Sequence, residues 1–208
     1  LREFGLDLPL GPAAVLTQVP TWLVDPDSPI PLPLRTALTE LIAEIRTLDT
    51  RITAIEQQLR EQAKLRPEVQ RLMTVPGIGL LIATALMAAV GGMTGFRDGR
   101  HLAAWLGLTP RESSSGQRRH LGGISKRGDC YLRMLLIHGA RSALLAAMAQ
   151  DRTGKKPLTR LQRWAVDLAA RVGHNKAACA LANKLARIAF AVVRQGRTFN
   201  GDFVSVAA

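Results

Sequence analysis

The amino-acid sequence predicts an all-α protein in which a long coiled-coil helix precedes a compact helical domain. Two observations support this fold class. Between residues 34 and 59 the apolar residues recur at alternating intervals of four and three, and most later apolar segments keep a helical period. Runs with the period-two alternation of a half-buried strand are few. With 208 residues, of which 47% are hydrophobic, the chain can bury a core in one or two domains.

Residues 1–33 are predicted to form a linker or irregular arm. They contain seven of the eleven prolines, and proline fixes φ and removes a backbone donor. The arm is expected to end where the apolar repeat of the next segment begins.

The segment 34–66 is predicted to be a coiled-coil helix, which Pro67 ends. Thr, Asp, Glu, Arg and Gln fill most positions outside one narrow apolar stripe, as in the seam of a coiled coil. The stripe consists of Leu34, Leu38, Leu41, Ile45, Leu48, Ile52, Ile55 and Leu59. Such a seam predicts self-association, as a dimer or a tetramer, or pairing with another helix. Packing of the helix against its own domain is the alternative.

A glycine turn at about residues 70–92 resembles a helix-hairpin-helix motif. One helix is expected to end near Met73 and a second to cover Leu80–Val90, with the sequence PGIG between them. Glycines let the backbone approach a phosphate closely, so Gly77 and Gly79 are candidate nucleic-acid contacts. An ordinary helical hairpin is the alternative.

The remainder of the predicted helical domain, which spans 67–208, contains three further helical regions. A short amphipathic helix is expected within 96–109 and a longer helix over 131–148. Two basic helices, joined near Gly173, are expected over 158–196.

The uneven charge distribution predicts a nucleic-acid partner. The net charge is +12, and residues 1–70 carry 7 Lys/Arg against 10 Asp/Glu, whereas residues 71–208 carry 21 against 6. A strongly basic half favours a polyanion. No membrane partner is expected, because no helix combines a basic face with an aromatic one. Cys130 and Cys179 fit a reducing compartment and predict no disulfide framework.

The segment 110–128, PRESSSGQRRHLGGISKRG, is predicted to be a basic, glycine-rich loop that contacts phosphate. Guanidinium groups offer bidentate donors and stabilise charge on the non-bridging oxygens of a phosphodiester. A serine in such a loop can attack phosphorus and conserve the bond as a phosphoserine, although a solvated turn is the alternative. The candidate phosphate contacts in and beside the loop are Arg111, Arg118, Arg119, Lys126, Arg127 and Arg133.

The last predicted helix carries a polar stripe at intervals of 7, 4 and 7, formed by Lys176, Asn183, Arg187 and Arg194. This stripe faces either nucleic acid or solvent. Two of its basic members, Lys176 and Arg187, together with the neighbouring Lys184, are candidate nucleic-acid contacts.

Tyr131 offers a different nucleophile, because tyrosine recombinases form a phosphotyrosine beside arginines and a histidine. Tyr131 and His138 are seven residues apart and share a helix face. Packing of Tyr131 in the core is the interpretation we favour. His138 and His174 are either general bases or helical histidines bonded to a neighbour.

Several motifs occur together in one order, namely Gly107-Leu108-Thr109-Pro110, Ser115-Gly116, Ile124-Ser125-Lys126-Arg127-Gly128 and Leu132-Arg133. The segment that contains them resembles the C-terminal transposase domain of bacterial insertion-sequence transposases of the bridge-RNA-guided kind, which are serine recombinases. The sequences VPGIG, RVGHNKAACALANKLARIAF and LREFGLDLPLG also resemble this family, so the likeness covers nearly the whole chain.

This resemblance implies that the nucleophile is the serine before glycine, Ser115, with Ser114 as the fallback. It implies DNA and a bridge (guide) RNA as partners, with base pairing choosing the DNA. The helix at 34–66 would join protomers and help to hold the RNA. A bacterial cytoplasmic protein associated with the nucleoid is expected.

One departure from the family concerns its N-terminal RuvC-like domain, whose four acidic residues bind Mg²⁺. This sequence contains no such domain, and its six acids after residue 70 are scattered. No cofactor and no metal site are therefore expected in this chain, and Mg²⁺ is expected in the missing domain. The chain is expected to be the C-terminal part of a transposase that binds nucleic acid but does not complete recombination alone. A non-catalytic helix-hairpin-helix adaptor that dimerises through its coiled coil is the alternative.

Overall fold

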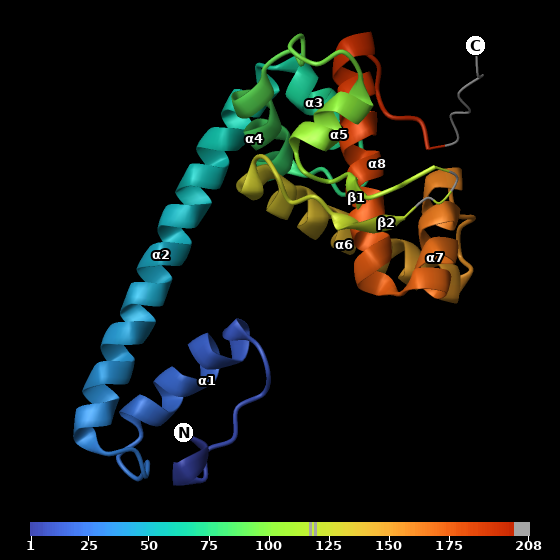
Figure 1. Cartoon of the computed structure of the whole chain (residues 1–208). Helices are drawn as coiled ribbons and strands as arrows, with labels where there is room; N and C mark the ends of the chain where they lie inside the picture. Colours follow the sequence, from blue (N-terminus) through green and yellow to red (C-terminus); the bar gives the residue numbers. More distant parts are fainter. Residues whose placement is uncertain (117, 119, 202–208) are drawn as a thin grey trace. The chain divides into compact units, whose positions relative to one another are not determined.

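The computed structural model describes residues 1–116, 118 and 120–201, and it is mostly helical, as predicted (Figure 1). The helices are α1 Pro12–Val24, α2 Leu32–Lys64, α3 Pro67–Met73, α4 Leu80–Val90, α5 Gly99–Trp105, α6 Cys130–Thr153, α7 Arg160–Val172 and α8 His174–Gln195, preceded by a 3₁₀ turn at Arg2–Phe4. The strands are β1 Pro110–Glu112 and β2 Leu121–Ile124. The chain divides into two compact units, Leu1–Gln58 and Leu59–Ala208.

Helix α1 lies where the prolines predicted an irregular arm, and over Pro12–Val24 that prediction is wrong. Pro12 occupies the first turn, where its missing N–H is not needed. Pro20 lies inside the helix and has no N–H to donate to the carbonyl of Leu16. The Arg46 guanidinium donates to that oxygen instead, at 3.5 Å, so a side chain partly replaces the missing bond.

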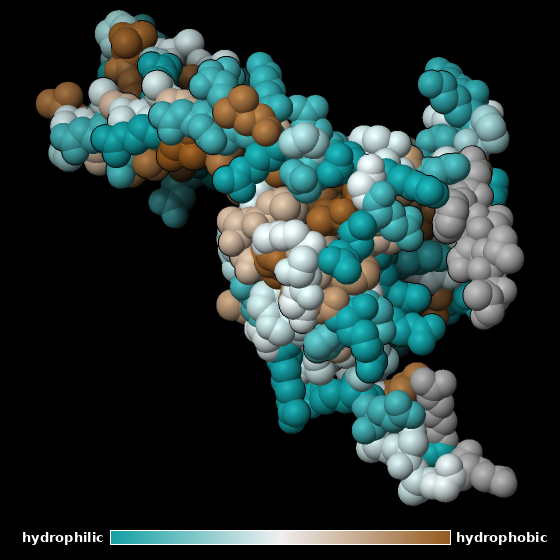
Figure 2. Space-filling view, turned by 90° about the horizontal axis from the view of Figure 1, so that it is seen from above, coloured by the Kyte–Doolittle hydropathy of each residue, from teal (hydrophilic) through white to brown (hydrophobic). Residues whose placement is uncertain are grey.

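The apolar stripe predicted on the long helix lies on α2 and remains largely exposed. Leu41 and Ile52 are each 54% exposed and Ile55 is 57% exposed, whereas Ile42, beside the stripe, is buried. Small groups of hydrophobic residues are visible among hydrophilic ones on the face shown in Figure 2. Exposed apolar side chains at heptad spacing leave a seam that a second helix can cover, so coiled-coil pairing stays a prediction.

Helices α6 and α8 form the centre of the second unit, and α5 and α7 pack against α8 (Figure 1). The core side chains of α8 are mostly small, so that neighbouring helices approach it closely. They are Ala177, Ala178, Leu181, Ala182, Leu185, Ala186, Ala189, Val192 and Val193. Gly173 separates α7 from α8, as predicted.

The glycine turn has the predicted boundaries, since α3 ends at Met73 and α4 covers Leu80–Val90. Its backbone packs against α6. A Cβ on Gly77, which has φ +85°, would lie 2.5 Å from the carbonyl oxygen of Gly139, and a Cβ on Gly139 would clash with the carbonyl oxygen of Gly77. The two glycines therefore allow backbone-to-backbone contact between the turn and α6.

Helix α6 is long and apolar enough to cross a membrane by length and composition alone. However, Leu136, Ala140 and Leu144 of this helix are fully buried within the second unit. The core helix of a globular domain has the same composition, and α6 packs against α4, α7 and α8.

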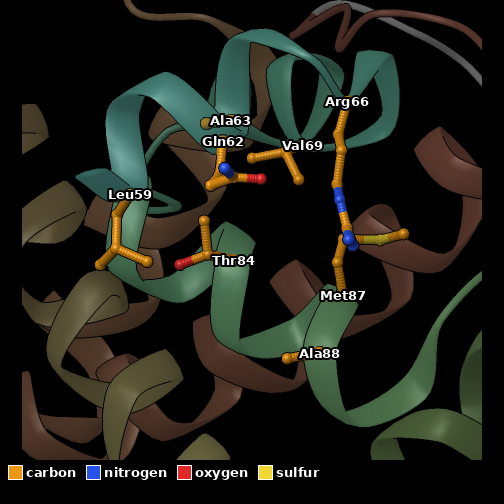
Figure 3. Close-up of a pocket in the computed structure, with 8 residues that line it drawn as sticks. All are labelled: Leu59, Gln62, Ala63, Arg66, Val69, Thr84, Met87 and Ala88. Atoms are coloured by element: carbon orange, nitrogen blue, oxygen red, sulfur yellow. The ribbon is translucent and has the colours of Figure 1, made fainter. Parts of the chain in front are cut away.

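An open cavity of about 200 Å³ lies between the end of α2, α3 and α4 (Figure 3). In Figure 3 the side chains of Arg66 and Met87 point toward each other at one side of it. The lining residues are Leu59, Gln62, Ala63, Arg66, Val69, Thr84, Met87 and Ala88. None of the candidate site residues lines this cavity.

Candidate functional site

Strands β1 and β2 form an antiparallel hairpin within the segment 110–128, which was predicted to be a basic, glycine-rich loop. This hairpin is the one exception to the all-α prediction in the described part of the chain. Strand β1 pairs with β2, and Glu112 lies opposite Leu121. Near the tip, the amides of Ser115 and Arg118 each donate to the other's carbonyl, at 3.2 and 3.0 Å. Gly116, which follows Ser115, has φ +56°, a conformation that glycine adopts without strain.

The three serines have different surroundings. Ser114 Oγ donates to the Glu112 carboxylate at 2.8 Å and accepts from the His120 amide at 3.2 Å. Ser113 Oγ lies 3.4 Å from Nδ1 of His120. The side chain of Ser115, the preferred nucleophile, is exposed at the turn. The carboxylate of Glu112 contacts Ser114, the fallback nucleophile.

The base of the hairpin packs tightly on the helices, in contrast to its exposed tip. Gly107, with φ +70°, approaches the backbone of Arg127, and Gly128, with φ +102°, approaches the carbonyl of Trp105. A Cβ on either glycine would clash with the carbonyl oxygen that it approaches. The motif that begins at Gly107 and the motif that ends at Gly128 therefore meet at the hairpin base. Only glycine fits at these two positions.

The predicted phosphate contacts of the hairpin fall into two groups. Arg111, Arg118, Lys126 and Arg127 are exposed. Arg133 is half-buried and donates through Nη1 to the carbonyls of Leu106 and Asp129, at 3.1 and 3.3 Å. Arg119 lies outside the described residues. The four exposed cations are available to a polyanion, whereas Arg133 contacts protein backbone.

Three further candidates lie on α8. Lys176 and Arg187 are exposed, and the Lys184 ammonium lies 3.9 Å from the ring centre of Trp164 on α7. Burial lowers the pKa of Lys184 below its usual value, and the positive charges of Arg187 and Arg160 lower it further. Like charges are therefore gathered at the α7–α8 contact, as in a surface that binds a polyanion.

The two candidate glycines of the turn differ in surroundings. Gly77 is half-buried against α6, so its conformation serves helix packing. Gly79 is exposed, caps the N-terminus of α4, and has open space where a Cβ would lie. Of the two, Gly79 is the one that a phosphate can approach.

Tyr131 is 50% exposed, so the prediction that it packs in the core is wrong. A helical pattern gives the face a residue occupies but not whether another element covers that face. His138 on the same helix is exposed and His174, at the start of α8, is half-buried. Within residues 1–116, 118 and 120–201, no three His, Cys, Asp or Glu side chains group as metal ligands do.

Asn183 has a contact that sequence reasoning missed. It was placed in a polar stripe facing nucleic acid or solvent, but its Nδ2 donates to the carbonyl of Leu108 at 3.1 Å. No local signal predicts a bond between residues 75 positions apart. The hairpin itself had a weak signal, a glycine directly after a serine run, which suits a two-residue turn.

Comparison with known proteins identifies similar sequences. The family profile described as "Transposase IS116/IS110/IS902 family" matches residues 69–156, which include the hairpin. A "Probable family 20 transposase" of Pseudomonas aeruginosa is 42% identical over 93% of this chain and 55% of its own length. The "Transposase for insertion sequence element IS1111A" of Coxiella burnetii is 37% identical over 96% and 53%. The "Transposase for insertion sequence element IS1328" of Yersinia enterocolitica is 38% identical over 96% and 57%, so the chain spans about half the length of these relatives.

Proposed function

Because the chain carries a domain of the IS116/IS110/IS902 transposase family, we propose that it is the C-terminal part of an insertion-sequence transposase that acts through a serine nucleophile. The observation that carries this proposal is the position of Ser115, exposed at the turn of a hairpin that also presents four exposed cations. The target is DNA, and a guide RNA selects it by base pairing. Action at the bacterial nucleoid, in the cytoplasm, follows from this target.

The proposed reaction is an in-line displacement at phosphorus. Ser115 Oγ forms a bond to phosphorus, its proton passes to a base, and the bond to the leaving strand's oxygen breaks as that oxygen gains a proton. The exposed arginines and Lys126 stabilise the charge on the non-bridging oxygens. A hydroxyl of the new strand then displaces the serine, so no bond energy is lost to water. We assign the base, with its Mg²⁺-binding acids, to a part of the transposase outside this chain.

Trapping a covalent intermediate tests this function. A transposase of the relatives' full length is incubated with guide RNA and a nicked DNA substrate that loses the leaving strand. The expected product is a protein–DNA adduct, with the modified residue mapped by mass spectrometry to residues 113–116. A non-catalytic adaptor that dimerises through α2, the second candidate function suggested by the exposed stripe, binds the same DNA and forms no adduct.

The α8 cations are expected to contribute to nucleic-acid binding by this chain. Lys184→Met keeps a side chain of similar length and removes the ammonium group that lies over the Trp164 ring. The slope of log affinity against log salt should then fall by about 1, the value for one lost phosphate contact. Fluorescence anisotropy with a labelled duplex measures it. Lys64→Met, in the exposed end of α2, serves as the control and should leave the slope unchanged. If the two variants change the slope equally, a phosphate contact at Lys184 is contradicted.

The exposed stripe of α2 is expected to mediate self-association. Ile52→Glu places a charge in the seam and should shift the chain to monomer, because a buried unpaired carboxylate is costly. Sedimentation velocity at several concentrations measures the change. The control Thr53→Glu, one position outside the stripe, should leave the association state unaltered. If the chain without any substitution is already a monomer, the proposal is contradicted.

A further inference from the structure

The hairpin base is closed by backbone hydrogen bonds between its two arms. The Lys126 amide donates to the carbonyl of Gly107 at 3.1 Å, and the Ser125 amide donates to the carbonyl of Thr109 at 2.8 Å. Alternate carbonyls of the segment leading into β1 are therefore bonded to the returning arm. These bonds hold the hairpin together but do not attach it to the helices.

The intervening carbonyls accept from side chains of two different helices. Arg133 Nη1 on α6 donates to the carbonyl of Leu106 at 3.1 Å and lies 3.5 Å from that of Gly128, on the other arm. Asn183 Nδ2 on α8 donates to the carbonyl of Leu108 at 3.1 Å. Four consecutive carbonyls are thus occupied, alternately by the hairpin itself and by the helical core.

The side chains between these carbonyls fix the segment further. Leu106 is 0% exposed and Leu108 is 1% exposed, so both are anchored in the core. Asn183 is half-buried, and loss of its amide would leave the Leu108 carbonyl short of a donor beside apolar groups. The segment can therefore neither slide nor rotate without breaking a hydrogen bond or exposing a leucine.

We infer that Asn183 and Arg133 are positioning residues that set the direction in which the serine hairpin leaves the helical domain. This inference rests on the proposed role of the hairpin in DNA strand transfer. A nucleophile about 1 Å from its productive place loses much of its rate, so a hairpin exposed at its tip needs a fixed base. Arg133, a predicted phosphate contact, donates to backbone through Nη1, and Asn183, predicted to face nucleic acid or solvent, donates to backbone through Nδ2.

Amide hydrogen exchange of the chain tests the attachment directly. Asn183→Ala should speed exchange of the Ser125 and Lys126 amides by about 5- to 10-fold, the equivalent of one net hydrogen bond. Exchange within α4 and α6 should be unchanged. The matched control is Asn175→Ala on the same helix, which removes a bond to Arg141 and should leave the hairpin amides unaffected.

Arg133 is tested by a pair of variants. Arg133→Met keeps much of the stem and should speed exchange at the same amides, whereas Arg133→Lys keeps one donor and should restore most of the protection. Uniform acceleration throughout the second unit would show a role in overall stability only and would overturn the inference. No acceleration at the hairpin base in Asn183→Ala would overturn it as well.

The consequence for chemistry is tested in the full-length transposase. Asn183→Ala should slow adduct formation while DNA affinity stays the same, because the positioning residue does not touch DNA. Unaltered adduct rates in a variant with faster hairpin exchange would overturn the positioning role. If the unaltered transposase forms no adduct, the proposed function fails, and the exchange experiment still decides whether the two side chains hold the hairpin.

Discussion

Replacing Ser115 with alanine should abolish the covalent protein–DNA adduct in the full-length transposase, because a methyl group cannot attack phosphorus. The side chain is exposed at the turn, so its loss should not alter stability or DNA affinity. Gel separation of the adduct under denaturing conditions measures the reaction, and anisotropy measures binding. Loss of the adduct with full binding is the expected result.

The neighbouring hydroxyls supply the controls. Ser114→Ala removes the bonds to Glu112 and to the His120 amide and should reduce the adduct without abolishing it. Tyr131→Phe should have no effect. If Ser114→Ala abolishes the adduct and Ser115→Ala does not, the nucleophile is one residue earlier in the chain. Loss of the adduct in Tyr131→Phe would mean that the covalent link is a phosphotyrosine. The exposed side chain of Tyr131 is accessible for such a link.

Replacing Gly139 with alanine should lower the free energy of unfolding of the helical unit by about 1–3 kcal/mol, the usual cost of overpacking. The new Cβ meets the carbonyl oxygen of Gly77, which is backbone and cannot rotate away. Alanine's higher helix propensity, worth about 1 kcal/mol, only partly offsets this. Urea unfolding followed by circular dichroism measures the change.

Gly79→Ala is the matched control within the same turn. Its added Cβ meets nothing within 4 Å, and φ is −85°, so stability should change by no more than about 0.5 kcal/mol. The control also separates packing from phosphate contact, because Gly79→Ala should weaken DNA binding if the α4 N-terminus meets the backbone. Equal stability losses in both variants would contradict the packing assigned to Gly139.

The helices were predictable wherever their boundaries have local causes. The end of α3 at Met73, the extent of α4 and the break at Gly173 follow from apolar periodicity interrupted by glycine and proline. Helix α1 was missed because proline content was judged over the whole segment rather than by position. Pro12 suits a first helical turn, and Pro20 is tolerated where Arg46 supplies another donor.

The candidate site was predictable in composition but not in geometry. Its motifs located the serines and basic residues in one segment, but glycines at 122 and 123 interrupt the alternation by which a strand is recognised. The contacts of Arg133 and Asn183 join residues 27 and 75 positions away, which only the folded helices bring together. A positive charge in a basic segment therefore did not reveal that Arg133 contacts backbone carbonyls.

The separation between the exposed turn at Ser115 and the tightly packed hairpin base has an evolutionary consequence. Substitutions near Ser115 change what the hairpin presents without touching the core, so they carry little stability penalty. Substitutions at Gly107 or Gly128 are constrained by backbone on the opposite arm or on α5. Substitutions can therefore accumulate at the tip without loss of the folded protein, while the glycines at the hairpin base stay fixed.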